Sequence, residues 1–231
     1  MTQITDHLAE TLERIANALA SAERGRDEAM LLAVSKQQPA AAIEAAYLAG
    51  QRHFGESFVQ EALPKMDRLA AREIEWHFIG RIQSNKTRAI AERFQWVHTV
   101  DRAKIAKRLN DQRPHLAPRL KTLIQVDLAG EPQKGGVAEA ALPELAAFVA
   151  AQPRLELKGL MTIPPADDSP ARKRGRFEQL AELRNELDAR GLHLDTLSMG
   201  MSADFELAIA AGSTCVRIGT GIFGPRRDPT G

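Results

Sequence analysis

Short apolar runs alternate with helix-like segments along almost the whole chain, and this alternation constrains the fold more than any other feature of the sequence. Runs such as Leu31-Leu32-Ala33-Val34 contain no polar residue, which is typical of strands buried on both faces of a parallel sheet. Gly or Pro marks most of the joints. The predicted strands are residues 31–35, 53–55, 76–80, 96–100, 122–128, 155–161, 196–199 and 214–218.

Helical segments lie between these strands, and strict alternation eight times over favours a parallel sheet closed into a barrel. Residues 4–22 repeat apolar side chains at helical spacing, so a further helix precedes the barrel. The predicted fold is α/β, a single (β/α)8 TIM barrel with an extra N-terminal helix. A flavodoxin-like open sheet, which normally has fewer strands, is the alternative. The predicted helices between strands are residues 39–49, 59–70, 85–92, 102–111, 140–151, 172–189 and 203–211.

The length of 231 residues suits one barrel, because such barrels form single units of about 250 residues. We therefore expect one domain that covers residues 1–231. Its N-terminal helix would lie within residues 1–26, the barrel within residues 27–224, and a tail would follow at residues 225–231.

Composition argues against several classes of partner. A formal net charge of +1 gives no global field that would recruit nucleic acid. The sequence has no apolar stretch long enough to span a membrane, and its amino terminus lacks the apolar segment of a signal peptide. Cys215 is the only cysteine, so an intrachain disulfide is impossible and a reducing compartment is expected. We expect a cytoplasmic monomer without nucleic-acid or membrane partners.

Lys36 directly follows the first predicted strand. Barrels place their chemistry at the carboxyl ends of the strands, where several loops meet. Desolvation there would disfavour the charged ammonium and yield a nucleophilic amine suited to a Schiff base with an aldehyde. The alternative is a strand-end lysine whose charge simply reaches solvent.

The loops after the last two strands have the composition of a phosphate site. Residues 198–202 read SMGMS and residues 219–221 read GTG. Barrels commonly hold a phosphate between these two loops, where backbone N–H groups and hydroxyls can donate to it. Ser198, Ser202 and Thr220 supply hydroxyls, although Ser202 could equally be a helix cap.

Arg217 lies within the last strand, two residues before Gly219, so its side chain could enter the barrel mouth. A guanidinium does not give up its proton, so a heteroaromatic nitrogen that accepts a hydrogen bond from it would stay unprotonated. The local sequence equally favours an alternative in which Arg217 forms an internal salt bridge.

Six blocks of the sequence together resemble the pyridoxal phosphate homeostasis protein family, whose barrel is similar to the N-terminal domain of alanine racemase. The resemblance covers essentially the whole chain in the family's order. The blocks are residues 33–36 (AVSK), 53–61 (HFGESFVQE), 76–86 (WHFIG and QSNK), 159–162 (GLMT), 198–202 (SMGMS) and 216–224 (VRIGTGIFG).

The resemblance implies that Lys36 carries pyridoxal 5′-phosphate (PLP) covalently as an internal aldimine. It further implies that Ser198, Gly219 and Thr220 hold the phosphate, and that Arg217 faces the pyridine nitrogen. Three neighbouring residues would shape the phosphate wall: Met199, Gly200 and Met201.

The chain departs from the family pattern at three places. The second block usually reads Asn-Tyr where this chain has Ser57-Phe58, so Ser57 would stand where the Asn contacts the ring. A family lysine two positions after Lys36 is Gln38 here. Lys134 matches a family lysine, but Gly135 follows it where Ser is common.

Two other polar residues receive structural interpretations. His77 alternates with Trp76 and Phe78, which favours a packed strand residue over a base. Asp127 ends the fifth predicted strand, where we expect it to cap the following turn. The six histidines show no close metal-ligand spacing, so no metal site is predicted.

Three functions are consistent with these residues. The first is a protein that binds PLP, limits the free aldehyde and passes it to apo-enzymes. The second is a PLP-dependent amino-acid racemase, and the third is a cofactor-free Schiff-base lyase. A racemase needs a second base, yet the sequence ends at Gly231 and the only tyrosine, Tyr47, lies in the helix after the first strand. We therefore expect binding and homeostasis of PLP without turnover, and assign no catalytic residue.

Overall fold

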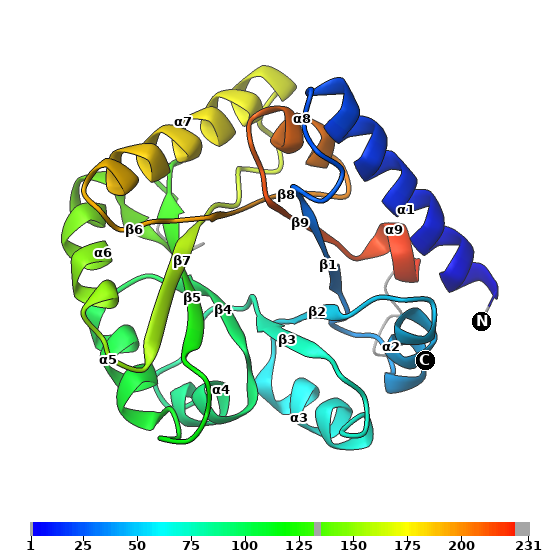
Figure 1. Ribbon diagram of the computed structural model, residues 1–231, viewed down its shortest axis with the longest axis horizontal. Coiled ribbons are helices and arrows are strands. Elements are labelled where there is room, and N and C mark those ends of the chain that lie inside the picture. Colours follow the sequence, from blue (N-terminus) through cyan, green and yellow to red (C-terminus); the bar gives the residue numbers. More distant parts are fainter. Residues whose placement is uncertain (1, 132–134, 225–231) are drawn as a thin grey trace.

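The computed structural model describes residues 2–131 and 135–224, and within them the chain forms a closed parallel barrel surrounded by helices (Figure 1). Eight strands follow the order β4-β3-β2-β1-β9-β8-β7-β5, and pairing of β4 with β5 closes the ring in the part of the chain described. The (β/α)8 barrel prediction is confirmed, and the open-sheet alternative is wrong. The barrel strands are β1 Met30–Val34, β2 His53–Glu56, β3 Glu75–Phe78, β4 Trp96–Val100, β5 Leu120–Asp127, β7 Leu155–Met161, β8 Thr196–Met201 and β9 Cys215–Ile218.

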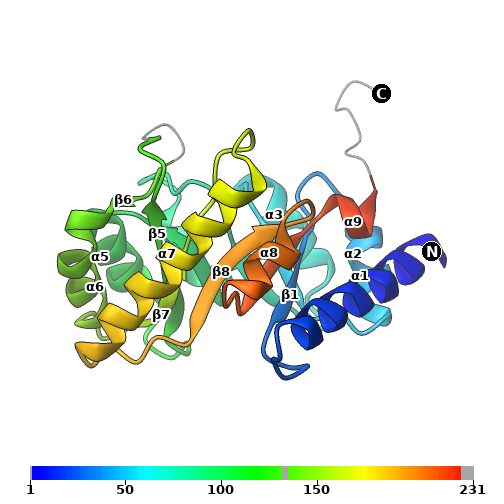
Figure 2. The same cartoon turned by 90° about the horizontal axis from the view of Figure 1, so that it is seen from above.

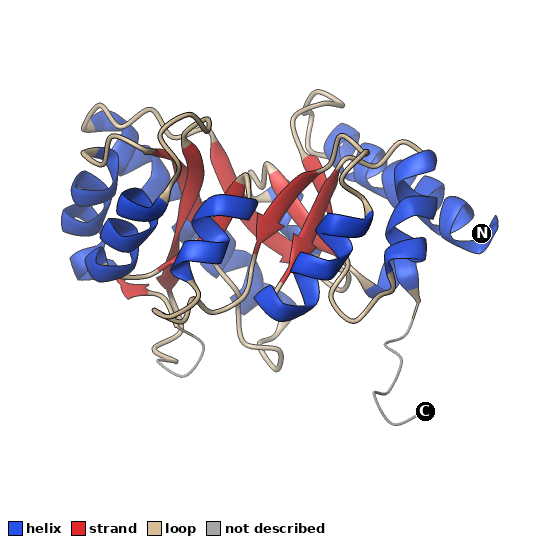
Figure 3. Cartoon of the chain, turned by 90° about the horizontal axis from the view of Figure 1, so that it is seen from below, coloured by secondary structure: helices blue, strands red, loops and turns tan. Residues whose placement is uncertain are grey.

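Helices cover the outside of the barrel, while the strands occupy its centre (Figures 2 and 3). The extra N-terminal helix α1, Thr2–Ser21, packs against α8 and α9. The remaining helices are α2 Ala40–Leu48, α3 Val59–Arg68, α4 Thr87–Arg93, α5 Ala103–Gln112, α6 Leu142–Ala150, α7 Pro170–Ala189, α8 Phe205–Ala210 and α9 Thr220–Phe223, with the 3-10 turn η2 at Glu139–Ala141.

Two short elements were not predicted. Strand β6, Val137–Ala138, pairs with Val126 and Asp127 of β5 outside the barrel ring. Helix α9 spans only Thr220–Phe223. Neither segment is long enough to show a hydrophobic period, which is the signal that identified the other elements.

The main apolar core lies between the sheet and the helices, and the barrel interior is different. Inside the barrel, Trp96, Leu123 and Met161 form a small separate cluster with Ile163 packed against it. The Trp96 ring stacks on His77, with the ring centroids 5.2 Å apart. Much of the remaining interior is polar.

A chain of hydrogen bonds runs through this interior, and we call it the histidine chain: His53, His77, His98, Ser198 and Arg217. His53 Nδ1 lies 3.1 Å from His77 Nε2, and His77 Nδ1 lies 2.9 Å from His98 Nε2. His98 Nδ1 lies 2.9 Å from Ser198 Oγ. Arg217 donates to the same hydroxyl at 2.8 Å. The histidine chain therefore links the amino-terminal ends of the strands to Arg217.

The buried histidines of this chain are neutral. Burial, with a smaller effect of the Arg217 cation, lowers the pKa of His98 to about 3. Burial also holds the pKa of His77 well below its usual range, and neighbouring His98 and His53 add to the effect. Each neutral ring can accept at one nitrogen and donate at the other, as the histidine chain requires.

Buried neutral histidines make stability depend on pH. Below pH 6.5 the unfolded chain binds a proton at His98, whereas the folded chain binds it only near pH 3. The free energy of unfolding therefore falls as the pH falls from 6.5 to about 3. Each such histidine contributes up to about 1.4 kcal/mol per pH unit. Urea unfolding measures how much the free energy of unfolding drops between pH 7 and pH 5. This drop should be smaller in His98→Gln than in the wild type by roughly 2 kcal/mol. The exposed His115→Gln is the control, and equal pH dependence in the wild type and His98→Gln would contradict the account.

Candidate functional site

A cavity of about 300 Å³ opens at the carboxyl ends of the barrel strands. This volume lies at the lower end of the range typical for small-molecule sites. Six of the nine predicted site residues line it: Lys36, Ser57, Met201, Arg217, Gly219 and Thr220. Gln38, Ile79, Ile163, Ser202, Ala203 and Gly224 also line it, together with Val34.

Lys36 lies in the turn between β1 and α2, and a buried ion cluster beside this turn fixes its backbone. Lys65 Nζ of α3 donates to the Ser35 carbonyl oxygen at 3.0 Å and to Glu56 Oε1 at 2.8 Å. It also donates to Glu61 Oε1 at 2.5 Å. The turn therefore depends on charged groups from β2 and α3.

Two further hydrogen bonds connect the same cluster to the residues on either side of Lys36. Ser35 Oγ donates to Glu56 Oε1 at 2.7 Å, and the backbone N–H of Gln37 donates to Glu61 Oε1 at 2.5 Å. Gln37 has a φ of 61°, a left-handed conformation that needs such support outside glycine. Burial raises the pKa of Glu56, and the Lys65 ammonium opposes this effect.

Arg217 is buried at the base of the cavity, on β9. One terminal nitrogen donates to Ser198 Oγ, and the other donates to the Thr162 carbonyl oxygen at 2.9 Å. Among the described residues no carboxylate forms an ion pair with it, so the salt bridge considered as an alternative is not seen there. These two contacts use two of the five N–H bonds of a guanidinium.

The loops after β8 and β9 approach each other at the cavity wall. Thr220 Oγ1 lies 3.4 Å from Ser202 Oγ, so two hydroxyls from different loops face the same space. A Cβ on Gly219 would lie 3.2 Å from the Val34 carbonyl oxygen, closer than nine in ten real Cβ contacts. Glycine at this position therefore lets the β9 loop pack tightly against β1.

Ser198, Met199 and Gly200 lie behind the cavity wall. Ser198 and Met199 are fully buried, and the Ser198 hydroxyl contacts Arg217 and His98. Gly200 has a φ of 91°, and a Cβ there would lie only 2.6 Å from the Ala208 Cβ. None of the three is among the residues that line the cavity, so the phosphate contact of Ser198 and the wall positions of Met199 and Gly200 stay predictions.

The remaining predictions from the sequence have mixed outcomes. Asp127 Oδ1 accepts from the backbone N–H groups of Ala129 and Glu131, which confirms the turn cap. His77 is a buried strand residue, as expected. Lys134 lies outside the described residues. Ile79 and Ile163 of the cavity wall were missed, because an apolar residue at a strand end carries no sequence signal for a site.

No helix in the described part of the chain combines the length and the apolar character needed to cross a membrane.

The whole chain is similar to proteins of one family. The family model for the alanine racemase N-terminal domain matches residues 5–227. The pyridoxal phosphate homeostasis protein of Escherichia coli is 50% identical over 229 residues, which cover 98% of each chain. Its counterpart in Pseudomonas aeruginosa is 51% identical over 226 residues, which cover 98% of this chain and 97% of the other.

Solved protein structures also resemble this chain in fold. PipY of Synechococcus elongatus with PLP bound superimposes with a TM-score of 0.81 at 39% identity, and the match covers 91% of this chain and 100% of PipY. Alanine racemase of Corynebacterium glutamicum, at 18% identity and a TM-score of 0.73, shares the fold over 96% of this chain and 62% of its own. The chain thus belongs to the alanine racemase N-terminal domain family and, within it, to the pyridoxal phosphate homeostasis proteins.

Proposed function

We propose that this protein binds PLP in the cavity at the carboxyl ends of the strands and takes part in PLP homeostasis without turning over a substrate. The observation that carries the proposal is the composition of the cavity wall. Among the described residues that line it, only Lys36 and Arg217 are ionisable. The names of the close relatives and the PLP-bound PipY structure support the choice of ligand.

The chemical groups around the cavity fit the three parts of this ligand. Lys36 would supply the amine for the aldehyde of PLP, with water as the other product of their condensation. The guanidinium of Arg217 would face the ring nitrogen. The phosphate would lie between the hydroxyls of Ser202 and Thr220, near the backbone of Gly219.

The same residues argue against turnover. Arg217 offers only donors, so a ring nitrogen facing it stays unprotonated and the ring withdraws electrons poorly. A racemase also needs an acid–base group on the opposite face of its substrate, and the only other ionisable described residue of the wall is Lys36 itself. Tyr47 lies on α2, where the guanidinium carbon of Arg52 lies 4.1 Å from the centre of its ring. The racemase alternative therefore lacks a partner for Lys36.

We also propose that the protein is a cytoplasmic monomer made of one domain, 1–231, which transiently meets apo-PLP enzymes. The location rests on the single, buried cysteine. Ser57 is proposed as a secondary contact because it lines the cavity.

Lys36→Ala should abolish the yellow colour of the PLP-loaded protein and its borohydride-reducible adduct, because no other amine among the described residues lines the cavity. Absorption spectra and mass spectrometry of the reduced protein measure this. Lys107→Ala, which removes an exposed lysine of α5, is the matched control and should leave both unchanged. Reduction that traps PLP mainly on Lys86 or Lys134 would show that the assignment is wrong.

Phosphate contacts should contribute much of the binding energy. Charge-assisted hydrogen bonds contribute about 1.5–3 kcal/mol each, so pyridoxal without its phosphate should bind at least ~10-fold more weakly than PLP. Thr220→Val should reduce this ratio, because it removes one hydroxyl and keeps the side-chain shape. Fluorescence or calorimetric titration gives both constants. Equal affinities for the two ligands in the wild type would refute the phosphate site.

The PLP-loaded protein should show no meaningful racemase, transaminase or decarboxylase activity, since the rate contribution of a second acid–base group is missing. Mixing it with an apo-PLP enzyme should instead restore that enzyme's activity over time. Racemisation of alanine or serine that disappears in Lys36→Ala would favour the enzyme and overturn the carrier role.

A further inference from the structure

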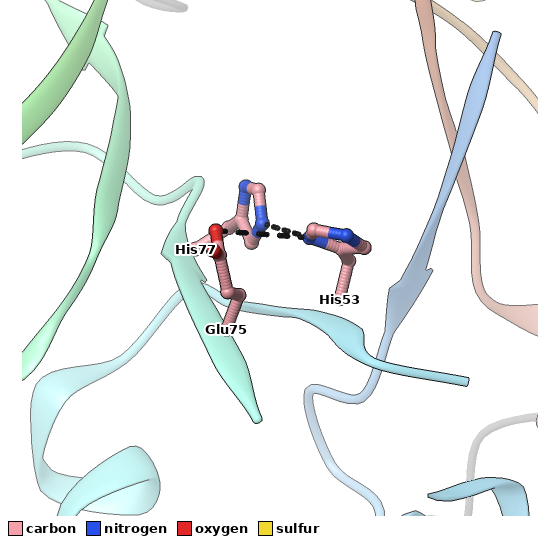
Figure 4. A group of neighbouring side chains, drawn as sticks. All are labelled: His53, Glu75 and His77. Atoms are coloured by element: carbon pink, nitrogen blue, oxygen red, sulfur yellow. Dashed lines mark hydrogen bonds and ion pairs between the residues drawn. The ribbon is translucent and has the colours of Figure 1, made fainter. Parts of the chain in front are cut away.

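Three potential metal ligands converge at the opposite end of the barrel from the cavity: His53, Glu75 and His77 (Figure 4). His53 and Glu75 are the first residues of β2 and β3. They pair with each other in the parallel register, and His77 lies two residues further along β3. Alternation along a strand therefore places all three side chains on the same, inner face of the sheet.

A small cation can replace the hydrogen bond between His53 and His77 when the neutral His53 ring carries its proton on Nε2, because Nδ1 and His77 Nε2 then both present lone pairs. His53 Nδ1 lies 3.1 Å from His77 Nε2 and 3.9 Å from Glu75 Oε2, and the three ligand atoms all lie within 4.8 Å of one another. Bonds of about 2.0–2.2 Å in tetrahedral geometry place neighbouring ligand atoms about 3.3–3.6 Å apart. A small movement of the Glu75 carboxylate towards the two rings would complete this geometry.

The residues behind the ligands already hold them in orientation. The second ring nitrogen of His77 lies 2.9 Å from His98 Nε2, and His98 continues to Ser198 Oγ at 2.9 Å. Trp96 Nε1 donates to Glu75 Oε2 at 2.7 Å. Metal-binding histidines and carboxylates typically have such outer partners, which fix the tautomer and the orientation of the ligand.

Access and charge at the cluster determine which ion could bind. The side chains of His53 and Glu75 are 31% and 39% exposed, so an ion can reach them from solvent. Lys121 Nζ lies 3.4 Å from both carboxylate oxygens of Glu75 and would compete with a metal ion. Its side chain is 34% exposed on a flexible stem, which allows it to move away.

We infer that His53, Glu75 and His77 form a binding site for a divalent transition-metal ion of the zinc class, with water as the fourth ligand. Two imidazoles and one carboxylate are a ligand set that suits zinc, copper and nickel in preference to magnesium or calcium. The site would be separate from the PLP cavity, and its existence does not depend on the proposed function.

Calorimetric titration of the tag-free, chelator-treated full chain with ZnCl₂ tests this site. The expected result is one zinc ion per chain. Glu75→Gln keeps an acceptor for Trp96 but weakens coordination, and His53→Ala removes a ligand at a partly exposed position. Each should weaken zinc binding at least ~10-fold, as loss of an outer partner alone already does.

Two further variants sharpen the test. Lys121→Met removes the competing cation and should tighten zinc binding. His115→Ala removes an exposed histidine that is not part of the cluster and should leave binding unchanged. Circular dichroism checks that each variant is folded. Zinc binding that is absent from the wild type, that persists in folded His53→Ala and Glu75→Gln, or that weakens in Lys121→Met would overturn the inference.

Discussion

The guanidinium of Arg217 is buried inside the barrel, and much of the interior is arranged around it. A buried charge is costly unless hydrogen bonds and an opposite charge compensate it. Here the Ser198 hydroxyl and the Thr162 carbonyl oxygen accept from it, and the neutral histidine chain fixes Ser198 from behind. These contacts leave the positive charge without a carboxylate partner among the described residues, so an electron-rich ligand would be stabilised at this point of the cavity.

The other end of the proposed ligand site is fixed from outside the barrel. The turn that carries Lys36 is hydrogen-bonded to the Glu56, Glu61 and Lys65 ion cluster, which β2 and α3 supply. Lys36 and Arg217 are therefore held by two independent polar networks, one on the helix side of the sheet and one in the interior. This arrangement suits a site that holds a bound ligand in one orientation.

The sequence predicted the barrel because strand–helix alternation is a property of consecutive residues. It also indicated Lys36, Arg217, Gly219 and Thr220, which all line the cavity. The side-chain directions on β8 could not be predicted, because the register shifts between Ser198 and Met201 against β9. With Gly200 at a φ of 91° within this register shift, the Ser198 hydroxyl contacts Arg217 while Met201 lines the cavity. The convergence of His53 with Glu75 likewise depends on strand register, which sequence spacing does not reveal.

In the proposed site Arg217 would face the ring nitrogen of PLP and keep it unprotonated. Nitrogen-15 NMR of the protein loaded with PLP labelled at the ring nitrogen measures this directly. We predict the chemical shift of an unprotonated, hydrogen-bonded pyridine at neutral pH, with a change in Arg217→Met. The shift of a protonated pyridinium in the wild-type protein, or a shift that Arg217→Met leaves unchanged, would contradict the account.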